Sequence, residues 1–242
     1  LYVLTYSITP YKEYIENPVS FLPRDINFKS YVHILSISLI QSGLLNSIYI
    51  TVITVIIHVI VLLTTAYPLS KSELKGRSVI LFLFVFTMFF RGGMIPDYFL
   101  MRKLGLLNSL WSLIFSLVIS SYNLVLMRAF IMSIPQSLED SAIMDGANHI
   151  QILYRIIAPL SKPAIATFSL FMAASQWNQY FRAILYITEI TKWPLQLVLR
   201  EILIDEEMLE QGIDMAMEQY VMPFNLKMTA IIITIVPILC VY

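Results

Sequence analysis

The sequence has little cysteine and little histidine. Its 242 residues include a single cysteine, Cys240, which lies in an apolar run. An internal disulfide and a thiolate zinc site both need more than one cysteine, so neither can form within one chain. The three histidines, His33, His58 and His149, are too scattered along the sequence to indicate a metal cluster. The sequence therefore predicts neither redox chemistry nor a metal site.

Charge is also scarce, and it is balanced. Asp, Glu, Lys and Arg make up 13% of the chain, against about 25% in a typical soluble domain. Sixteen basic and sixteen acidic residues give a formal net charge of zero. The chain thus has no basic surplus with which to neutralise a phosphate backbone. These properties argue against an ordinary cytosolic protein and against nucleic acid as a partner.

Enzymatic signatures are missing as well. The sequence contains no phosphate-binding G-x-x-x-x-G-K-[ST] segment, so the chain itself is not expected to hydrolyse ATP. No His/Asp/Glu or Ser/His combination falls in one plane of the predicted membrane segments. We expect no catalytic residue and no cofactor on this chain.

Hydrophobic residues, in contrast, are abundant. They make up 58% of the chain, and the mean hydropathy is +0.75. Eleven prolines, fourteen tyrosines and fourteen phenylalanines suit broken membrane helices with aromatic ends. The sequence predicts an all-α polytopic membrane protein located in the cell membrane.

Five membrane spans are predicted from apolar runs of about 20 residues, the length that a bilayer core requires. The clearest is 44–69, which has no charged residue apart from the titratable His58. The run 79–90 is long enough only when extended to about 75–96. Further spans are expected at about 110–130, at 159–177, and from 228 to 242. The apolar residues 1–4 look like the end of an earlier helix, so we expect a first helix before them and a last helix that is cut short.

The most informative polar segment runs from Pro135 to Pro163, between the third and fourth predicted spans. Ser137 and Asp140 approximate a capping box, so a short helix is predicted to begin there. Gly146 is predicted to end or bend that helix. A second, amphipathic helix is then expected to lead to Pro159, with its apolar face formed by Ile150, Leu153, Ile156 and Ile157. Such a helical hairpin at the membrane surface either docks on a soluble partner or merely joins two spans.

The run Asp140-Ser141-Ala142-x-x-x-Gly146, followed by Ile156 and Pro159, resembles the EAA motif. This motif is typical of the permease subunits of binding-protein-dependent ABC importers. Asp140 and Ser141 replace the Glu and first Ala of that pattern, and Ala158 replaces its usual Leu. Residues 145–147, Asp-Gly-Ala, agree with it.

Other segments resemble the carbohydrate branch of these permeases. They are Gly92-Gly93-Met94-Ile95-Pro96, the segment from Lys103 to Trp111, Gln176-Trp177-Asn178, and the segment from Trp193 to Arg200. The whole chain is similar to maltose-transporter-like second permease subunits, particularly those for oligosaccharides and uronate-containing saccharides. The resemblance implies a type I ABC importer permease fold, normally of six spans. It makes residues 1–242 one transmembrane domain, with 135–159 as a cytoplasmic coupling segment.

The resemblance also implies partners and a topology. The partners would be a second related permease, two ATP-binding subunits that hold ATP and Mg, an extracytoplasmic solute-binding protein, the lipid bilayer and a carbohydrate solute. Residues 70–78 and 131–158 would face the cytoplasm, and residues 10–42 and 178–227 the outside. Residues expected to couple the chain to the ATP-binding subunits are Glu139, Asp140, Ser141, Ala142, Asp145, Gly146 and Ala147.

Candidates for the solute path are polar and aromatic residues near the predicted outer surface, since a desolvated sugar needs its hydroxyl groups satisfied. The first set is Trp177, Asn178, Gln179, Tyr180 and Arg182, and Arg182 is the candidate contact for an anionic sugar. The second set is Asn46, Tyr49, Thr51, Tyr122 and Asn123. An aromatic belt at the membrane interface is the competing interpretation of the first set. For His58, a neutral ring bonded to a neighbouring helix is favoured over a functional role.

Two other classes of transporter stay open. An ion-coupled secondary transporter normally has acidic residues within its spans, whereas every Asp and Glu here lies outside the predicted spans. The second alternative is an ABC importer permease for a solute other than a sugar, such as an amino acid or an oligopeptide.

Overall fold

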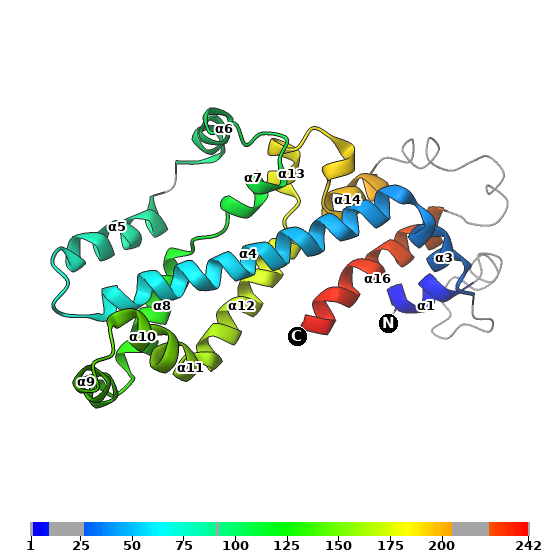
Figure 1. Cartoon of the computed structure of the whole chain (residues 1–242). Helices are drawn as coiled ribbons and strands as arrows, with labels where there is room; N and C mark the ends of the chain where they lie inside the picture. The colour runs from blue at the N-terminus through cyan, green and yellow to red at the C-terminus, as the bar shows by residue number, and fades with distance from the viewer. Residues whose placement is uncertain (1, 10–26, 91, 205–222, 242) are drawn as a thin grey trace. The chain divides into compact units, whose positions relative to one another are not determined.

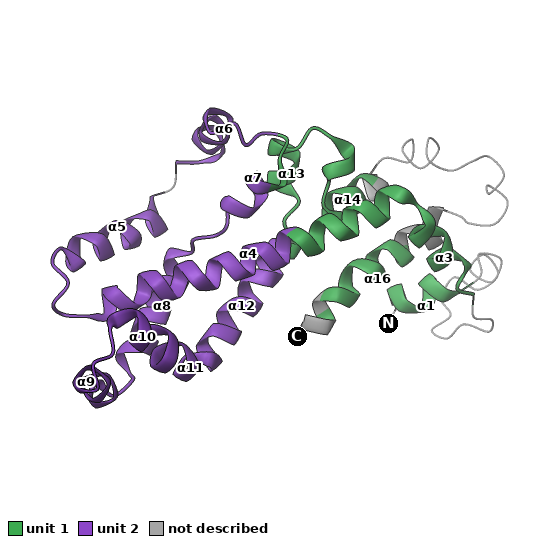
Figure 2. Ribbon diagram, viewed as in Figure 1, with its two compact units in different colours: residues 1–49, 108–110, 177–242 green, residues 50–107, 111–176 purple. Residues whose placement is uncertain are grey.

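A computed structural model describes residues 2–9, 27–90, 92–204 and 223–241, and all regular structure in these ranges is helical (Figure 1). The chain divides into two compact units (Figure 2). Unit 1 comprises residues 1–49, 108–110 and 177–242, and unit 2 comprises residues 50–107 and 111–176. The predicted outside segments lie partly beyond the described ranges, at 10–26 and 205–222.

Helix α4 (Ser38–Ser70) is the longest element, with 33 residues. It contains the predicted span 44–69, so that prediction is confirmed. At 1.5 Å per residue the helix is about 50 Å long, which exceeds the bilayer core of about 30 Å. Within the described ranges, α4 is the only helix that is long and apolar enough to cross a membrane by itself.

The predicted span over about 75–96 is present as a bent pair of helices. Helix α5 (Arg77–Phe89) ends before the paired glycines, and α6 (Met94–Lys103) begins after them at an angle of 119°. Gly93 has a φ of +88°, a backbone conformation that L residues with side chains rarely adopt. Helix α5 ends with Phe90 in an extended conformation, and Gly93 supplies the turn just before α6, at a point where hydropathy alone suggests continuation.

The predicted span 110–130 is also broken. Helix α7 (Leu110–Phe115) and helix α8 (Ser121–Met132) are separated by residues 116–120, which are not helical. Ser120 caps α8, because its Oγ accepts a hydrogen bond of 3.3 Å from the N–H of Asn123. Caps of this kind depend on single hydrogen bonds, which an apolar run does not reveal.

Helices are present at the positions of the last two predicted spans. Helix α12 (Lys162–Trp177) lies where the fourth span was expected, and it makes an angle of 79° with the helical segment 149–160. Helix α16 (Pro223–Val241) begins before the expected start at Met228. By length and composition, the described residues hold one span, or up to three if each bent pair counts as one, whereas five spans were predicted.

The core of unit 2 forms where α4, α8 and α12 meet α10 (His149–Ile152) and the π-turn η1 (Leu153–Ile157). Its centre includes Ala66, Met127, Ile131, Ile152 and Ile157, each at most 2% exposed. Helix α11 (Ala158–Leu160) then leads to α12. This core supports α9 (Gln136–Met144), which lies before α10 in the chain.

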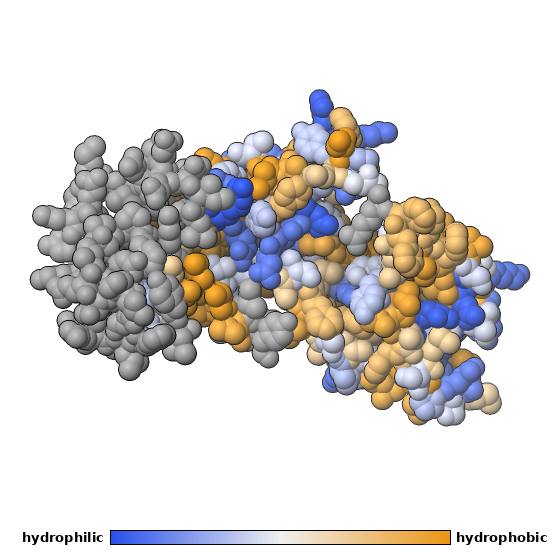
Figure 3. All heavy atoms as spheres, turned by 180° about the vertical axis from the view of Figure 1, so that it is seen from behind, coloured by the Kyte–Doolittle hydropathy of each residue, from blue (hydrophilic) through white to orange (hydrophobic). Residues whose placement is uncertain are grey.

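Helix α5 shows the opposite pattern, because none of its side chains is buried. Val79, Phe82 and Phe89 are 62%, 63% and 77% exposed. Hydrophobic residues, orange in Figure 3, cover broad areas of the face drawn there. An apolar surface of this extent is typical of contact with lipid or with another apolar partner.

Unit 1 contains α1 (Tyr2–Ile8), α3 (Lys29–Ser36), α13 (Phe181–Tyr186), the short helix η2 (Ile190–Lys192), α14 (Leu195–Ile204) and α16. The beginning of α4 packs closely on α14. A Cβ atom on Gly43 would lie 3.3 Å from Cα of Leu195, and Ser47 Oγ accepts a 2.8 Å hydrogen bond from the N–H of Leu195. Asn46 donates to the carbonyls of Thr191 and Trp193 at 2.9 and 3.1 Å. These contacts fix the segment that precedes α14.

Candidate functional site

The hairpin formed by α9 and α10 turns at Gly146, as predicted. Gly146 has a φ of +81°. Its N–H donates to the carbonyl of Ile143, and the N–H of Ala147 donates to the carbonyl of Ala142, both at 2.9 Å. This pair of bonds is a Schellman motif, which satisfies the free carbonyls at a helix end.

The predicted capping box at Ser137 and Asp140 is wrong. Helix α9 begins at Gln136 after Pro135, without a side-chain cap, so Ser137 lies inside its first turn. The capping box belongs to α10 instead. There Asn148 Oδ1 accepts from the N–H of Gln151 at 2.8 Å, and Gln151 Oε1 accepts from the N–H of Asn148 at 2.9 Å. The Asn-x-x-Gln spacing was visible in the sequence and could have identified this cap.

The second helix of the hairpin contains a π-turn just before Pro159. The N–H of Ala158 bonds to the carbonyl of Leu153, five residues earlier. Leu153 and Ile157 are buried as predicted, whereas Ile150 is 67% exposed, so its expected place on the apolar face is wrong. The wider turn changes the helical period, and Ile152 takes the buried position instead.

The tip of the hairpin presents a mixed surface. Asp140, Ser141, Asp145 and Gly146 are exposed, while Ala142 and Ala147 pack against the core of unit 2. Large apolar side chains are exposed beside them: Ile143 is 50% exposed and Met144 87%. Exposed apolar groups within a polar rim are typical of a surface that another protein covers.

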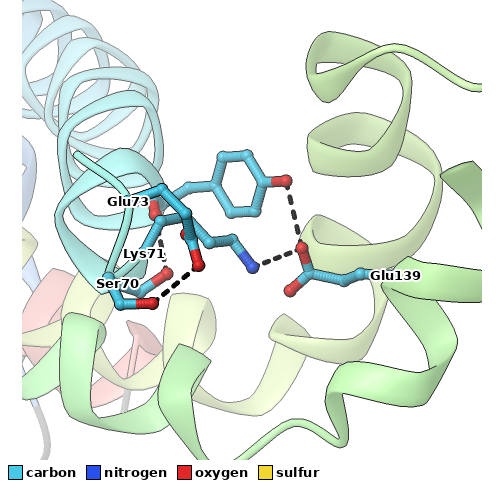
Figure 4. Close-up of polar contacts among 6 residues, drawn as sticks. Ser70, Lys71, Glu73 and Glu139 are labelled. Atoms are coloured by element: carbon cyan, nitrogen blue, oxygen red, sulfur yellow. Dashed lines mark hydrogen bonds and ion pairs between the residues drawn. The ribbon is translucent and has the colours of Figure 1, made fainter.

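Glu139 differs from its neighbours because it is buried, with 5% exposure. Its Oε2 accepts a 3.1 Å hydrogen bond from the hydroxyl of Tyr67 and forms an ion pair with Lys71 Nζ (Figure 4). Glu73 lies on the turn next to Lys71 and is exposed. A hydrogen bond from Ser72 holds the pKa of the Glu73 carboxyl below its usual range. Of the predicted coupling residues, Glu139 is therefore the one whose charge is paired inside the chain.

A hollow of about 760 Å³ lies beside this ion pair. Its walls come from the end of α4, the turn after it, α9 and α10, and they include Lys71, Asp140, Ile143, His149 and Ile150. The hollow is open and lined by groups of both charges, so it adds a concave region to the surface of the hairpin.

The first set of solute-path candidates lies in unit 1, and its members have different environments. Trp177 is buried, and its indole N–H donates to the carbonyl of Thr234 at 3.2 Å. Asn178 is exposed, Gln179 and Arg182 are half-buried, and Tyr180 is 43% exposed. The guanidinium of Arg200 lies 5.8 Å from the centre of the Tyr180 ring. Arg200 was not among the solute-path candidates chosen from the sequence.

In the second set, Asn123 is bonded to His58 within unit 2. His58 Nδ1 lies 2.6 Å from the carbonyl oxygen of Val118, and His58 Nε2 lies 3.2 Å from Asn123 Nδ2. The carbonyl needs a donor, which assigns the proton to Nδ1 and leaves Nε2 to accept from the amide. The expected bond from His58 to a neighbouring helix is confirmed through Asn123 on α8, and this assignment of donors and acceptors suits a neutral ring. The hydrogen bond from His58 satisfies the Val118 carbonyl in the break between α7 and α8, because lipid offers no donor for such a carbonyl.

The other members of the second set occupy α4 and α8. Tyr49 and Tyr122 are 43% and 57% exposed, Thr51 is half-buried, and Asn46 holds the segment before α14 as described above. Among the described residues, no group of three or more His, Cys, Asp or Glu side chains could hold a metal ion.

The long apolar helix, the bent helix pairs and the exposed hairpin define a helical membrane protein. The model of the family described as "Binding-protein-dependent transport system inner membrane component" matches residues 74–242. The chain belongs to this family. The predicted permease class and membrane location are therefore confirmed.

Similar proteins of known name agree with this assignment. The chain is 38% identical over 247 residues to the polygalacturonan/rhamnogalacturonan transport system permease protein YtcP of Bacillus subtilis (strain 168), covering 100% of this chain and 85% of the relative. It is 38% identical over 243 residues to protein LplC of the same strain, with coverages of 100% and 82%. A crystal structure of a bacterial ABC transporter involved in the import of the acidic polysaccharide alginate matches with a TM-score of 0.92 and 35% identity, covering 100% of this chain and 86% of that one. The predicted importer permease fold is confirmed.

Proposed function

We propose that this chain is the membrane-spanning permease subunit of an ATP-driven importer that moves an oligosaccharide across the cell membrane. Support comes from the substrates in the names of its relatives. Those names include polygalacturonan and rhamnogalacturonan, alginate, and, at 26% identity over the full length of this chain, diacetylchitobiose. All are carbohydrates, and several are acidic. The proposal treats residues 1–242 as one transmembrane domain.

The observation that carries the proposed mechanism is the exposed, rigidly turned hairpin over 135–159. Backbone bonds at Gly146 and the Asn148 cap fix its shape without a partner. Its exposed face then offers Asp140, Ser141 and Met144 to a soluble protein. We assign this face to the ATP-binding subunits, on the cytoplasmic side. This face lies in the proposed coupling segment 135–159, which also contains Ala142, Asp145, Gly146 and Ala147.

ATP and Mg belong to those partner subunits, since this sequence lacks a phosphate-binding loop. The complete importer would contain this chain, a second related permease, two ATP-binding subunits and an extracytoplasmic solute-binding protein. When ATP closes its two subunits, the hairpins docked on them are drawn together. The spans attached to each hairpin then move as rigid bodies and expose the solute cavity to the other side.

For the solute path, exposure favours some candidates over others. Tyr180 presents an aromatic face of the kind that packs on a sugar ring. Asn178 and Gln179 lie directly before it in the chain, and Arg182 lies two residues after it. Trp177 and Asn123 are weaker candidates because each is buried and has a polar partner within its own unit. An arginine near the path suits a carboxylated sugar.

The test is to purify the native complex in mild detergent and identify its subunits by mass. ATP hydrolysis is then measured with the solute-binding protein alone and loaded with an oligogalacturonide or an oligoalginate. We expect a second permease and an ATP-binding subunit to co-purify, and the loaded binding protein to stimulate hydrolysis. A chain that purifies alone and does not bind ATP-binding subunits would contradict the proposal.

A further inference from the structure

Helix α9 is attached to unit 2 through a charged side chain. Among its nine residues, Glu139 is the one buried side chain. The large apolar residues of the helix face outward: Leu138 is 44% exposed, Ile143 50% and Met144 87%. Only Ala142 adds a partly buried apolar contact with the core. Apolar burial, which holds most helices in place, is therefore small for α9.

The partners of Glu139 both come from the end of α4. Tyr67, in the last turn of α4, is 4% exposed and donates its hydroxyl to Glu139. Lys71, directly after α4, supplies the ion pair, and its Nζ also lies 5.0 Å from the centre of the Tyr67 ring. Each of the three groups thus contacts the other two. A buried carboxylate that loses such partners is destabilised by more than an exposed one, because water does not replace them fully.

The end of α4 is itself held firmly. The carbonyl of Leu69 accepts a 2.7 Å hydrogen bond from Arg128 Nε on α8. Leu63, Ala66 and Leu69 are buried in the core of unit 2. A displacement applied to α9 at Glu139 therefore acts on a helix end that is held by a hydrogen bond and by core packing.

We infer that Glu139, with Lys71 and Tyr67, is a positioning residue that anchors the coupling helix α9 to the span α4, so that movement of α9 becomes movement of α4. We call these three residues the Glu139 anchor. Glu139 then has no direct role in binding the ATP-binding subunit, and the adjacent exposed Asp140 is left for that contact. This inference rests on the proposed function, in which the hairpin docks on an ATP-binding subunit.

The first experiment measures coupling in the assembled importer, reconstituted in liposomes with its binding protein. Glu139→Gln and Lys71→Met each remove one charge with little change in size, and Glu73→Gln serves as the matched control on an exposed carboxylate of the adjoining turn. The readout is oligosaccharide transported per ATP hydrolysed. We expect the two anchor variants to lower this ratio by about threefold or more, and the control to keep the wild-type ratio. Exchanging the charges, Lys71→Glu with Glu139→Lys, is expected to restore at least half of it.

A second experiment tests the anchor without transport. Amide hydrogen exchange of the purified full chain in detergent reports how firmly α9 is held. We expect the amides of α9 to exchange about tenfold faster in Glu139→Gln, while those of α4 keep their protection. Glu73→Gln is expected to exchange like the wild type.

These measurements separate the two proposals. A wild-type complex that does not couple ATP to sugar uptake would contradict the proposed function, while faster exchange of α9 would still support the anchor. Unchanged exchange of α9 in Glu139→Gln would overturn the anchor. The anchor would also be overturned if both single variants kept the wild-type ratio of sugar transported per ATP. The same holds if the charge-exchanged variant showed a ratio no higher than that of the single variants.

Discussion

Replacing Gly146 by valine tests whether the shape of the hairpin matters for coupling. Gly146 adopts a φ of +81°, and a Cβ atom added there would meet nothing within 4 Å. The penalty is therefore conformational and not steric. An L residue in this region costs about 1–2 kcal/mol, and a β-branched one lies at the upper end or beyond. Since 1.4 kcal/mol is a factor of ten, the correctly turned hairpin becomes about tenfold less populated relative to other conformations.

The assay is a titration of the membrane subunits with the ATP-binding subunit, read by sugar-stimulated ATP hydrolysis. We expect Gly146→Val to weaken the apparent affinity by at most about tenfold, because binding falls only with the fraction of correctly turned hairpin, while the amount of chain in the membrane stays the same because residue 146 is exposed. Gly146→Asn is the matched control, since asparagine tolerates the left-handed region, and it should titrate within about twofold of the wild type. Wild-type behaviour of Gly146→Val would refute the reasoning. An asparagine variant as weak as the valine variant would also refute it, because the loss would then come from the side chain and not from the backbone.

Other substitutions test separate parts of the structure. His58→Leu leaves the Val118 carbonyl without its donor, so we expect a loss of about 1–3 kcal/mol in unfolding free energy, measured by denaturation in detergent; wild-type stability would contradict this assignment. Gly43→Val places side-chain atoms against the backbone of Leu195 and should cost about 1–3 kcal/mol in the same assay, whereas Gly43→Ala should cost less; equal stability of all three proteins would argue against the close packing. Tyr180→Ala is expected to raise the sugar concentration for half-maximal transport at unchanged stability, and an unaltered transport curve would remove Tyr180 from the solute path.

Features that depend on composition or on one residue type were predictable from the sequence. Helix α4 has a long uncharged run, so its existence follows from hydropathy alone. The turn at Gly146 follows because glycine is the residue that adopts a positive φ without strain. Family membership was indicated by the resemblance of the segment from Asp140 to Pro159 to the EAA motif.

Features that depend on hydrogen bonds between distant residues were not predictable. The break after Phe115 is stabilised by a local cap at Ser120 and by His58, which lies more than fifty residues away in the chain. Hydropathy is the same whether such a segment is helical or not. Likewise, the sequence placed Glu139 among the residues expected to couple the chain to the ATP-binding subunits, and only the fold shows that it is buried and paired with Lys71. Burial of a polar residue is set by the tertiary structure.

The backbone shape of the hairpin and its exposed surface depend on different residues. Gly146, Asn148 and Gln151 determine its backbone, and the bonds that do so involve none of the side chains at Asp140 or Met144. The exposed positions can therefore change while the geometry stays the same. Under the proposed docking, a cell that holds several importers of this family can in this way give each permease a different face for its own ATP-binding subunit. Partner choice would then evolve through a few surface substitutions, without any new fold.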